Sequence, residues 1–496
     1  MSFLTPTGVS IPRHSVIVGS GMTDRGSGAT WAHVYPANGQ ITSELRLAGR
    51  SDVDAAVLAA RAAAPAWRAL SGDKRRDLML RMAALIEQHS GELAKLSTLE
   101  NGAPSMIAPH FAMDAVQKFR YYAGWADKLR GETLSAWGAP AHDYVSYEPY
   151  GVIGAIIPWN GPLFAATMVV TPALATGNCV VLKAPELAPY TVMRLGELFL
   201  EAGFPPGVVN VLAGGADVGE AMVAHPGIDK IQFVGSGSTA KKVLRTAAER
   251  LKPCGLELGG KSAVIVFADA DLQSAARRGL SGAISVSGQG CVNGTRLLVE
   301  RPIYEAYLKM LAGIAPHIKI GDPVDPSTVM GPVISGASLQ RICGVVETAV
   351  KTDGVRVVVG GDRLAGEHAA GFYLPITVLA DVAPDSALAQ NEVFGPVLTV
   401  TPFDTEEEAI AIANGTDYGL GAYVHTENLR RAHVVASQLQ AGMIHVNGGG
   451  EAMQPFAPFG GMRSSGYGRL GGEQGLREFL QTKNVWVGLA QSQAAR

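Results

Sequence analysis

One stretch decides the expected fold: Gly151-Val152-Ile153-Gly154-Ala155-Ile156-Ile157-Pro158-Trp159-Asn160-Gly161-Pro162. Its first half is apolar and uncharged, which is typical of a buried strand, and the prolines that follow end that strand. Similar apolar runs occupy residues 179–182, 208–212 and 228–234, with helical stretches between them. Strands that alternate with helices predict an α/β fold with a doubly wound parallel sheet.

Polar side chains stand where these predicted strands end. Asn160 follows the first strand, Lys183 and Glu186 follow the second, and Ser236 follows the fourth. Ligands of doubly wound sheets bind beyond the carboxyl ends of the strands. We therefore expect a ligand site along this edge.

The rest of the chain predicts a second α/β unit and an exposed tail. A strand is expected over residues 263–267 and a helix from 271 to about 286. Residues 483–487 are β-rich, and an unpaired strand of this kind predicts pairing with another subunit. A chain of 496 residues with 60 glycines and 47% hydrophobic residues fits a large enzyme of two or three domains.

The charge pattern argues against two classes of partner. A net charge of −3 gives no electrostatic basis for binding nucleic acid or an anionic membrane. The run 149–182 is uncharged, but Pro158, Pro162 and Pro172 interrupt it, so no membrane-spanning helix is expected there. Residues 1–16 show no secretory-signal pattern, and a cytoplasmic location is the expectation.

Disulfides and metal sites are not expected. The 4 cysteines include no CxxC pair, and so few thiols in a long chain do not indicate a disulfide framework. The 11 histidines form no HExxH or other metal-ligand cluster. We expect no metal.

Cys291 is the candidate nucleophile. It lies in Ser287-Gly288-Gln289-Gly290-Cys291-Val292-Asn293-Gly294, where glycines allow the backbone to approach a ligand. A thiol presented in this way attacks an electrophilic carbon once it is deprotonated. A packed free cysteine is the alternative, but packing favours bulkier neighbours.

Glu257 is the candidate base. It lies among apolar and glycine residues in Gly255-Leu256-Glu257-Leu258-Gly259-Gly260, where a carboxylate is poorly solvated. Such a site raises the pKa of the carboxyl group and suits it to general-base chemistry.

Two nucleotide motifs overlap this region. Residues 255–262 match the phosphate-loop pattern GxxxxGK[ST], but a β-rich run follows Lys261 where that loop requires a helix. Residues 235–240 match the dinucleotide pattern GxGxxA, and Glu257 lies 20 positions beyond Gly237, where a ribose-binding acid is expected. Glu257 therefore has three interpretations: general base, ribose clamp or structural cap.

Taken together and in order, the motifs resemble those of the NAD(P)-dependent aldehyde dehydrogenase superfamily along nearly the whole chain. The motifs that carry this resemblance are Pro158-Trp159-Asn160, Lys183-Ala184-Pro185-Glu186, Gly203-Phe204-Pro205-Pro206-Gly207-Val208, Phe233-Val234-Gly235-Ser236, Leu256-Glu257-Leu258-Gly259-Gly260-Lys261, Gly288-Gln289-Gly290-Cys291, Asn391-Glu392-Val393-Phe394-Gly395-Pro396, Pro458-Phe459-Gly460-Gly461 and Ser465-Gly466.

The resemblance implies a division of roles. Cys291 would attack the aldehyde carbon to form a thiohemiacetal and then a thioester, and Glu257 would activate the water that releases the acid. The Asn160 amide and the Cys291 backbone N–H would stabilise the oxyanion. The cofactor would be NAD, because a Glu186 carboxylate repels the 2′-phosphate of NADP.

The resemblance also implies which residues contact the cofactor and the substrate. Lys183 and Glu186 would hold the adenosine ribose, Ser236 a phosphate and Glu392 the nicotinamide ribose. The expected cofactor-binding residues are Ile156, Ile157, Pro158, Trp159, Lys183, Glu186, Gly215, Gly235, Ser236, Leu258, Glu392 and Phe394, and the expected substrate-pocket residues are Gly161, Ala165 and Phe459.

The implied domains are a Rossmann-type NAD-binding domain (residues 1–128 and 148–258), an α/β catalytic domain (259–458) and a small β oligomerisation arm (129–147 and 478–496). A homodimer or homotetramer is expected. Val169 and Leu470 replace a Lys and a Glu that many members carry near the proton exit from the base, which suggests a drier or rerouted exit.

Gly161 replaces an aromatic residue beside the catalytic Asn and predicts a bulky, apolar or aromatic aldehyde. No charge occurs from 149 to 178, so an uncharged pocket is expected, which disfavours anionic semialdehydes. Residues 448–453 are a loop that could refill the pocket. Two alternatives stay open: a CoA-acylating semialdehyde dehydrogenase, against which Glu257 argues, and a catalytically inactive binding or structural homologue.

Overall fold

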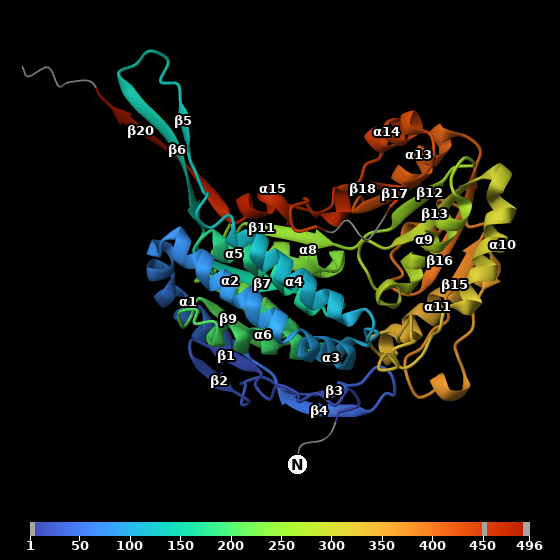
Figure 1. The fold of residues 1–496 in the computed structure, drawn as a ribbon, viewed down its shortest axis with the longest axis horizontal. Helices are drawn as coiled ribbons and strands as arrows, with labels where there is room; N and C mark the ends of the chain where they lie inside the picture. Colours follow the sequence, from blue (N-terminus) through green and yellow to red (C-terminus); the bar gives the residue numbers. More distant parts are fainter. Residues whose placement is uncertain (1–4, 449–453, 490–496) are drawn as a thin grey trace, which may run out of the picture.

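Two α/β lobes and a projecting arm make up the protein, which is described here as a computed structural model for residues 5–448 and 454–489 (Figure 1). The residues up to 258 build most of the first lobe, and the residues from 262 build most of the second. The three parts each contain their own β-sheet. The α/β class and the Rossmann-type parallel sheet are confirmed.

The first sheet is parallel at its centre. β10, β7, β8 and β9 run parallel with β11, while β1, β2 and β19 add antiparallel edges. Among the described residues its spatial order is β19 (Gly466–Tyr467), β11 (Cys254–Leu258), β10 (Lys230–Gly235), β7 (Val152–Ile156), β8 (Cys179–Pro185), β9 (Val209–Gly214), β1 (Val16–Val18) and β2 (Gly21–Thr23).

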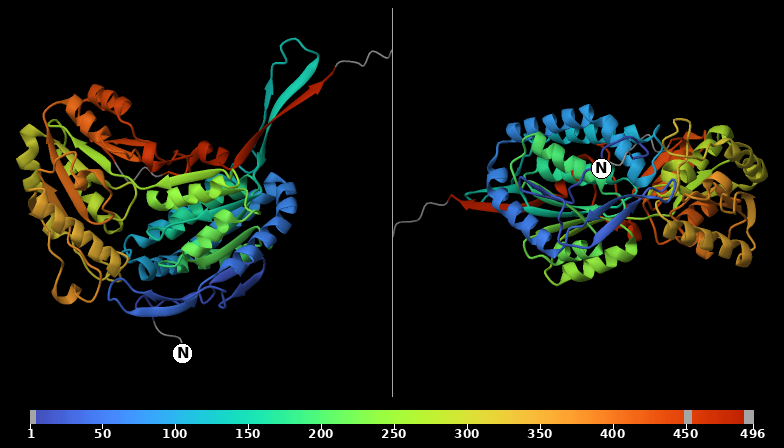
Figure 2. Two further views of the ribbon diagram at one scale, coloured as in Figure 1. Left: turned by 180° about the vertical axis from the view of Figure 1, so that it is seen from behind. Right: turned by 90° about the horizontal axis from the view of Figure 1, so that it is seen from below.

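Helices cover both faces of this sheet (Figure 2). One layer contains α2 (Gly72–Gln88), α3 (Ser90–Asn101), α4 (Ala108–Ala123), α5 (Pro162–Ala175) and α6 (Tyr190–Glu201). The other contains α1 (Arg50–Ala69), α7 (Ala216–Ala224) and α8 (Gly237–Ala248). Because β7 and β8 are buried on both faces, every residue in them is buried, as their continuous apolar runs predict.

The second lobe repeats the α/β principle. Its sheet is parallel except for the β14–β15 pair. The strands in spatial order are β14 (Arg356–Val359), β15 (Thr377–Ala380), β16 (Val397–Phe403), β13 (Gly294–Glu300), β12 (Ser262–Val266), β17 (Gly421–His425) and β18 (Met443–Val446). The helices of this lobe are α9 (Leu272–Ile284), α10 (Tyr304–Ile314), α11 (Gly336–Thr352), α12 (Ala387–Gln390), α13 (Glu406–Asn414) and α14 (Leu429–Gln438).

The arm consists of β20 (Leu480–Gly488), β6 (Ala141–Pro149) and β5 (Glu132–Leu134) and extends away from both lobes (Figures 1 and 2). The tail strand pairs along its length with β6 of the same chain, with Val485 opposite Tyr144. The tail is therefore a strand, as expected, and it pairs first within its own chain; its outer edge has no partner among the described residues, and pairing with another subunit stays a prediction. Residues 490–496 of the expected arm lie outside the described residues.

The remaining elements join or flank these units: β3 (Thr30–Val34) and β4 (Ile41–Arg46) form a two-stranded sheet, and α15 (Gly472–Arg477) precedes the arm. All 4 cysteines are free. Among the described helices, none has both the length and the apolar character needed to cross a bilayer.

Candidate active site

Three loops and strand ends bring the predicted catalytic residues to one region. Asn160 lies between the end of β7 and the start of α5 at Pro162. Glu257 lies in β11, paired with Val234 of the neighbouring β10. Cys291 lies in the loop between the 3-10 turn η1 (Ser285–Gly288) and β13.

The loop that carries Cys291 is held in an unusual backbone conformation. The preceding helix ends at Ile284, earlier than the expected residue 286, because Val286 and Ser287 adopt left-handed φ values of +50° and +54°. Gly288 then packs closely against another segment of the same lobe: a Cβ at Gly288 would lie 2.1 Å from the Gly395 backbone. The loop is therefore fixed against residues 395–396, and only glycine fits at 288.

Asn160 contacts the cysteine loop directly. Its Nδ2 donates a hydrogen bond to the carbonyl oxygen of Gln289 at 2.6 Å. Asn101 at the end of α3 supports the backbone, donating to the Asn160 carbonyl at 3.4 Å. Because a side-chain amide carries two N–H donors, Asn160 can hold Gln289 and still offer one hydrogen to a ligand.

Glu257 is a buried carboxyl group without a hydrogen-bond partner. It is 2% exposed, and neither carboxyl oxygen finds a partner among the described residues. Burial raises the pKa of Glu257 well above its ordinary value, although the charge of Arg469 opposes the shift. Gly460 lies against it, since a Cβ there would be 2.6 Å from Oε1. A buried carboxyl group without a hydrogen-bond partner destabilises the fold, and such groups are typical of functional sites.

The thiol of Cys291 is protonated at rest. Burial raises the pKa of Cys291 to about 12, and the negative charges of Glu392 and Glu257 add to the shift. Because the thiolate is the reactive form, the thiol needs a nearby base to become a nucleophile.

Tyr423 of β17, which the sequence did not single out, fixes the other side of the cysteine loop. Its hydroxyl donates to the Val292 carbonyl at 2.9 Å, and its ring stacks on His445 with 5.3 Å between centroids. A tyrosine in a buried strand is no signal by itself, so this role needed the structure.

The predicted cofactor residues lie along one edge of the first sheet. They lie near or just beyond the carboxyl ends of five adjacent strands: Ile156, Ile157, Pro158 and Trp159 at β7, Lys183 and Glu186 at β8, Gly215 at β9, Gly235 and Ser236 at β10, and Leu258 at β11. Glu392 and Phe394 reach the same edge from the second lobe, where Glu392 Oε1 accepts a hydrogen bond from the Gly260 amide at 3.2 Å.

The chemistry of this edge fits a dinucleotide. Lys183 Nζ donates to Glu186 Oε2 at 3.4 Å, which places a cation and a carboxylate where ribose hydroxyls can bind. At the start of α8 no atom lies within 4 Å of the Cβ position of Gly237, so the helix N-terminus is open to a phosphate. The rings of Trp159 and Phe394 meet edge to face, 5.5 Å apart.

The phosphate-loop pattern at 255–262 does not form such a loop. β12 begins at Ser262, directly after Lys261, so no helix N-terminus follows. Lys261 is 2% exposed and its Nζ has no partner among the described residues. Among those residues, no cluster of three or more metal-ligating side chains occurs either.

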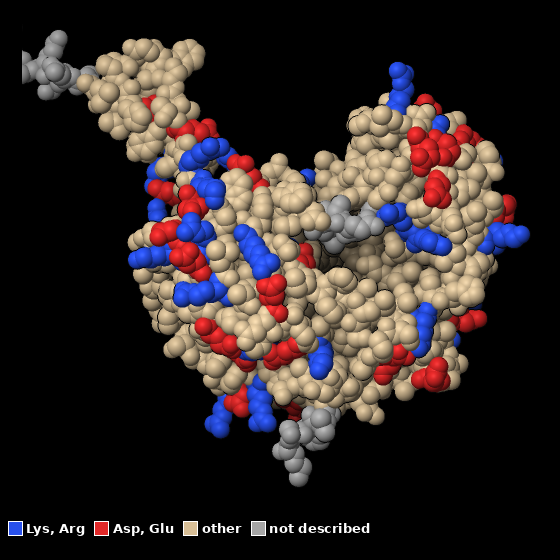
Figure 3. Space-filling view, in the orientation of Figure 1, with Lys and Arg blue, Asp and Glu red and all other residues tan. Residues whose placement is uncertain are grey.

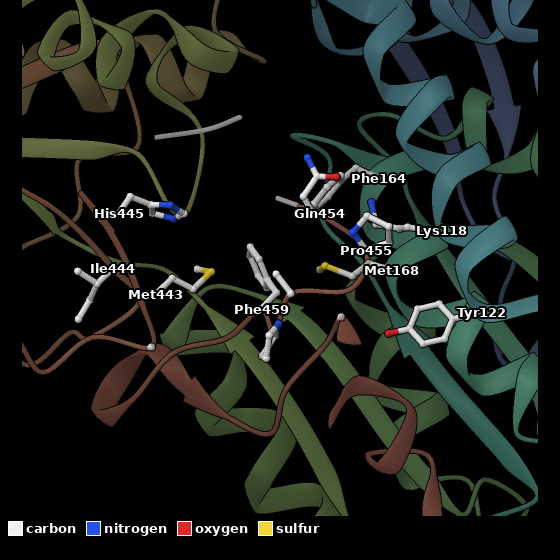
Figure 4. Close-up of a pocket in the computed structure, with 14 residues that line it drawn as sticks. Lys118, Tyr122, Phe164, Met168, Met443, Ile444, His445, Gln454, Pro455 and Phe459 are labelled. Atoms are coloured by element: carbon white, nitrogen blue, oxygen red, sulfur yellow. The ribbon is translucent and has the colours of Figure 1, made fainter. Parts of the chain in front are cut away.

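A cavity of about 300 Å³ opens beside α5 (Figure 4). Phe164 and Met168 of α5 form one side, Met443 and Ile444 of β18 the other, and Phe459 lies between them. The rings of Phe164 and Phe459 are 6.5 Å apart. Phe459 precedes Gly460, which packs against Glu257, but Cys291, Asn160 and Glu257 themselves are not among the residues that line this cavity.

One expectation about this cavity is wrong. The uncharged run 149–178 suggested a pocket without charge, but α4 packs on α5 and adds Lys118 to the cavity wall. Lys118 lies in a helix whose other inward positions are apolar, among them Val116 and Phe119. The sequence does show a lysine among apolar helix positions, but nothing in it indicates that α4 lies close to the region of Asn160.

The two other predicted pocket residues differ in their surroundings. At Gly161, φ is −160° and a Cβ would meet only Phe164 Cβ, at 3.7 Å. Gly161 is not among the residues that line the cavity. Ala165 is buried and is not among the residues that line the cavity. Of the loop 448–453, residues 449–453 lie outside the described residues.

Val169 and Leu470 are fully buried. Both are 0% exposed, and Leu470 pairs through its backbone with Phe459, its amide donating at 2.8 Å. Arg469, next to Leu470 in the chain, donates from Nη1 to the Gly461 carbonyl at 2.7 Å.

Comparison with known proteins gives a consistent result along the whole chain. The sequence model of the "Aldehyde dehydrogenase family" matches residues 23–485. Retinal dehydrogenase 2 of Rattus norvegicus is 40% identical over 474 residues, covering 94% of this chain and 90% of that protein.

Solved structures agree. PnpE from Pseudomonas sp. WBC-3 superposes with a TM-score of 0.94 at 38% identity, covering 98% of this chain and 99% of that one. Betaine aldehyde dehydrogenase from Staphylococcus aureus, in complex with NAD+, gives a TM-score of 0.95 at 33% identity, covering 98% and 96%.

Proposed function

The chain belongs to the aldehyde dehydrogenase family, and we propose that it oxidises an aldehyde to the carboxylic acid with NAD as cofactor. The observation that carries the proposal is the convergence of three groups: the Cys291 thiol, the Asn160 amide bonded to the cysteine loop, and the buried, unpaired Glu257 carboxyl. Each group suits one step of this oxidation.

In the first step the Cys291 sulfur adds to the aldehyde carbon. A carbon–sulfur bond forms, the thiol proton is released, and the carbonyl electrons move to oxygen. The free N–H of Asn160 and the backbone N–H of Cys291 stabilise this oxyanion. NAD, when bound, supplies the two-electron acceptor that the oxidation requires, and Cys291 is left as a thioester.

In the last step Glu257 removes a proton from water, and the resulting hydroxide attacks the thioester carbon. The carbon–sulfur bond breaks, the carboxylic acid leaves and the sulfur regains its proton. The raised pKa of Glu257 brings this carboxyl closer to the range that suits a general base at neutral pH. Glu257 also argues against a CoA-acylating enzyme, which needs no water-activating base.

The edge of the first sheet would hold the cofactor. Lys183 and Glu186 would bind the adenosine ribose, Ser236 a phosphate and Glu392 the nicotinamide ribose. Trp159 and Phe394 would bound the site.

We further propose a bulky, apolar or aromatic substrate. The cavity is lined largely by Phe164, Met168, Met443, Ile444 and Phe459, and Gly161, which directly precedes α5, adds no side chain near Phe164. Burial of apolar contact area contributes about 25 cal/mol per Å², so a ring-sized group gains substantially there. The related retinal dehydrogenase 2 is named for a large apolar aldehyde.

A homodimer or homotetramer is proposed from the arm. The outer edge of β20 is unpaired in the described chain, and Trp137 and Trp486 are 95% and 54% exposed. Figure 3 shows the arm tip, residues 133–142, as a surface without Lys, Arg, Asp or Glu. Exposed strand edges and apolar patches of this kind mark association surfaces. A monomer by light scattering at micromolar concentration would contradict this proposal.

A cytoplasmic location stays a prediction.

The deciding experiment for the activity is NADH formation from NAD and an aromatic aldehyde. Wild-type protein should form NADH, and Cys291→Ala should form none while still binding NAD. Cys343→Ala is the matched control, because Cys343 is a free thiol on α11. Absence of NADH with wild-type protein would support the inactive-homologue alternative.

A further inference from the structure

A buried lysine borders the cavity that the aldehyde would occupy. Lys118 is 5% exposed, and its Nζ lies 3.7 Å from the centroid of the Phe164 ring (Figure 4). Phe164 in turn faces Phe459 across 6.5 Å. The ammonium group therefore lies at one end of an aromatic wall whose other end, Phe459, adjoins the Glu257 region.

The charge of Lys118 is balanced on its own helix. Asp114, one turn earlier on α4, forms an ion pair with the ammonium. Burial lowers the pKa of Lys118 and raises the pKa of Asp114, while the attraction between the partners opposes both shifts. The pair places a hydrogen-bond donor at the cavity without adding net charge.

The ammonium has a donor left for a ligand. A lysine ammonium carries three N–H donors. In the described part of the chain, Asp114 accepts one of them, and the Phe164 ring covers another side. Since Lys118 lines the cavity, a remaining N–H is available to an acceptor inside it.

Resting on the proposed aldehyde oxidation, we propose that Lys118 donates a hydrogen bond to an uncharged oxygen of the substrate, remote from its aldehyde group. The substrate class is then an aromatic aldehyde that carries an ether or hydroxyl oxygen. The ring packs along Phe164 and Phe459, and the oxygen reaches Lys118. Lys118 determines specificity and takes no part in bond making.

The Lys118–Asp114 ion pair favours an uncharged oxygen substituent over a carboxylate, a cationic group or a plain hydrocarbon. A carboxylate substituent would share one ammonium with Asp114 and leave a net negative charge in largely apolar surroundings, which is costly. A cationic substituent would be repelled by the ammonium. A plain hydrocarbon ring would leave the remaining N–H buried without a partner.

The test compares substrate pairs of similar shape by NADH formation. One pair is 4-methoxybenzaldehyde and 4-ethylbenzaldehyde, and a longer pair is 4-methoxycinnamaldehyde and 4-ethylcinnamaldehyde. In at least one pair, the ratio of kcat/KM (methoxy over ethyl) should be about tenfold higher in wild type than in Lys118→Met. The electronic difference between the substituents is the same for both enzymes and cancels in this comparison. Lys95→Met, an exposed lysine on α3, should leave the ratio unchanged.

A second variant tests the charge balance. Asp114→Asn leaves the Lys118 ammonium without its counter-charge. The kcat/KM for 4-carboxybenzaldehyde, relative to 4-ethylbenzaldehyde, should then rise about tenfold over the wild-type ratio. If thermal unfolding shows that Lys118→Met does not fold, the carboxy-to-ethyl ratio of Asp114→Asn tests the proposal in its place, and an unchanged ratio would overturn it.

Contrary outcomes separate the two levels of the proposal. If wild-type protein forms NADH but the methoxy-to-ethyl ratios do not change in Lys118→Met, the Lys118 assignment is overturned and the proposed function stands. A wild-type preference for 4-carboxybenzaldehyde over all other aldehydes would overturn it in favour of an anionic substrate. If no aldehyde yields NADH, the proposed function fails and this inference with it.

Discussion

The Nδ2 of Asn160 donates a hydrogen bond to the carbonyl oxygen of Gln289, two residues before Cys291, at 2.6 Å. The bond joins the first lobe to the loop of the second lobe that carries the nucleophile. It fixes the plane of the amide, so that its second N–H has a defined direction. Preorganised donors of this kind stabilise an oxyanion without reorganisation during the reaction.

Asn160→Ala should therefore lower kcat by about 10²–10³-fold, the usual cost of removing one oxyanion donor. Steady-state NADH formation measures this effect. The binding of NAD, followed by fluorescence, should change little, because the Asn160 amide is directed at the Gln289 carbonyl of the cysteine loop. A variant with near-normal kcat would show that Asn160 only shapes the turn before α5.

Glu257→Gln should separate the two halves of the reaction. The variant keeps Cys291 and Asn160, so acylation proceeds, but no base activates the water. We expect roughly one equivalent of NADH per active site in a burst, followed by a stalled acyl-enzyme visible by intact-protein mass spectrometry. Loss of NAD affinity with normal turnover of the acyl-enzyme would instead identify Glu257 as a ribose clamp.

The same variant should alter how stability depends on pH. Because burial raises the pKa of Glu257, the folded state keeps this proton to a higher pH than the unfolded chain does. The free energy of unfolding of the wild type therefore falls as the pH rises above the unfolded pKa of about 4.3. Glutamine cannot titrate, so the Tm of Glu257→Gln minus that of wild type should increase from about pH 5 to about pH 8. Parallel Tm curves would contradict a raised pKa.

The site residues that lie in strands or directly after them could be predicted from the sequence. Apolar runs located β7, β8, β9 and β10, and the residues directly after them were placed on the cofactor edge by the rule that parallel strands end together. The composition of Gly255–Gly260 also indicated a poorly solvated Glu257, because the residues on both sides of it in the sequence are apolar or glycine. Local sequence and tertiary environment agreed at these positions.

Contacts between distant segments were not predictable in the same way. Lys118 lines the cavity beside α5 only because α4 packs on α5, and Tyr423 holds the Val292 carbonyl only because β17 lies beside β12. The early end of α9 also escaped prediction, since Val286 adopts a left-handed conformation that a β-branched residue disfavours. Gly288, in the same turn, packs on Gly395, far along the chain.

Glu186 should set the preference for NAD over NADP. Its carboxylate accepts a hydrogen bond from Lys183 and is partly exposed, so it can bind ribose hydroxyls but repels a 2′-phosphate. In a partly shielded site this repulsion is on the order of 1–3 kcal/mol. Glu186→Ser should thus reduce the ratio of kcat/KM for NAD over NADP by about tenfold or more. Glu197→Ser, on the outer side of α6, is the control; equal use of both cofactors by wild type would contradict the assignment.

Gly161→Phe should shift the enzyme from large to small aldehydes. At Gly161 φ is −160°, outside the left-handed region that favours glycine, and a Cβ there would contact only Phe164 at 3.7 Å. The added ring would occupy the open space at Gly161 and remove room for an aromatic substrate. We expect kcat/KM for benzaldehyde and cinnamaldehyde to fall by about tenfold or more relative to acetaldehyde, since a lost ring contact of several tens of Å² is worth more than 1 kcal/mol. Gly161→Ala, whose methyl group reaches little of this space, should keep most of the wild-type ranking. An unchanged ranking in Gly161→Phe, or a wild-type preference for acetaldehyde, would contradict this interpretation of Gly161, because the aromatic substrate would then bind away from Gly161 or not at all.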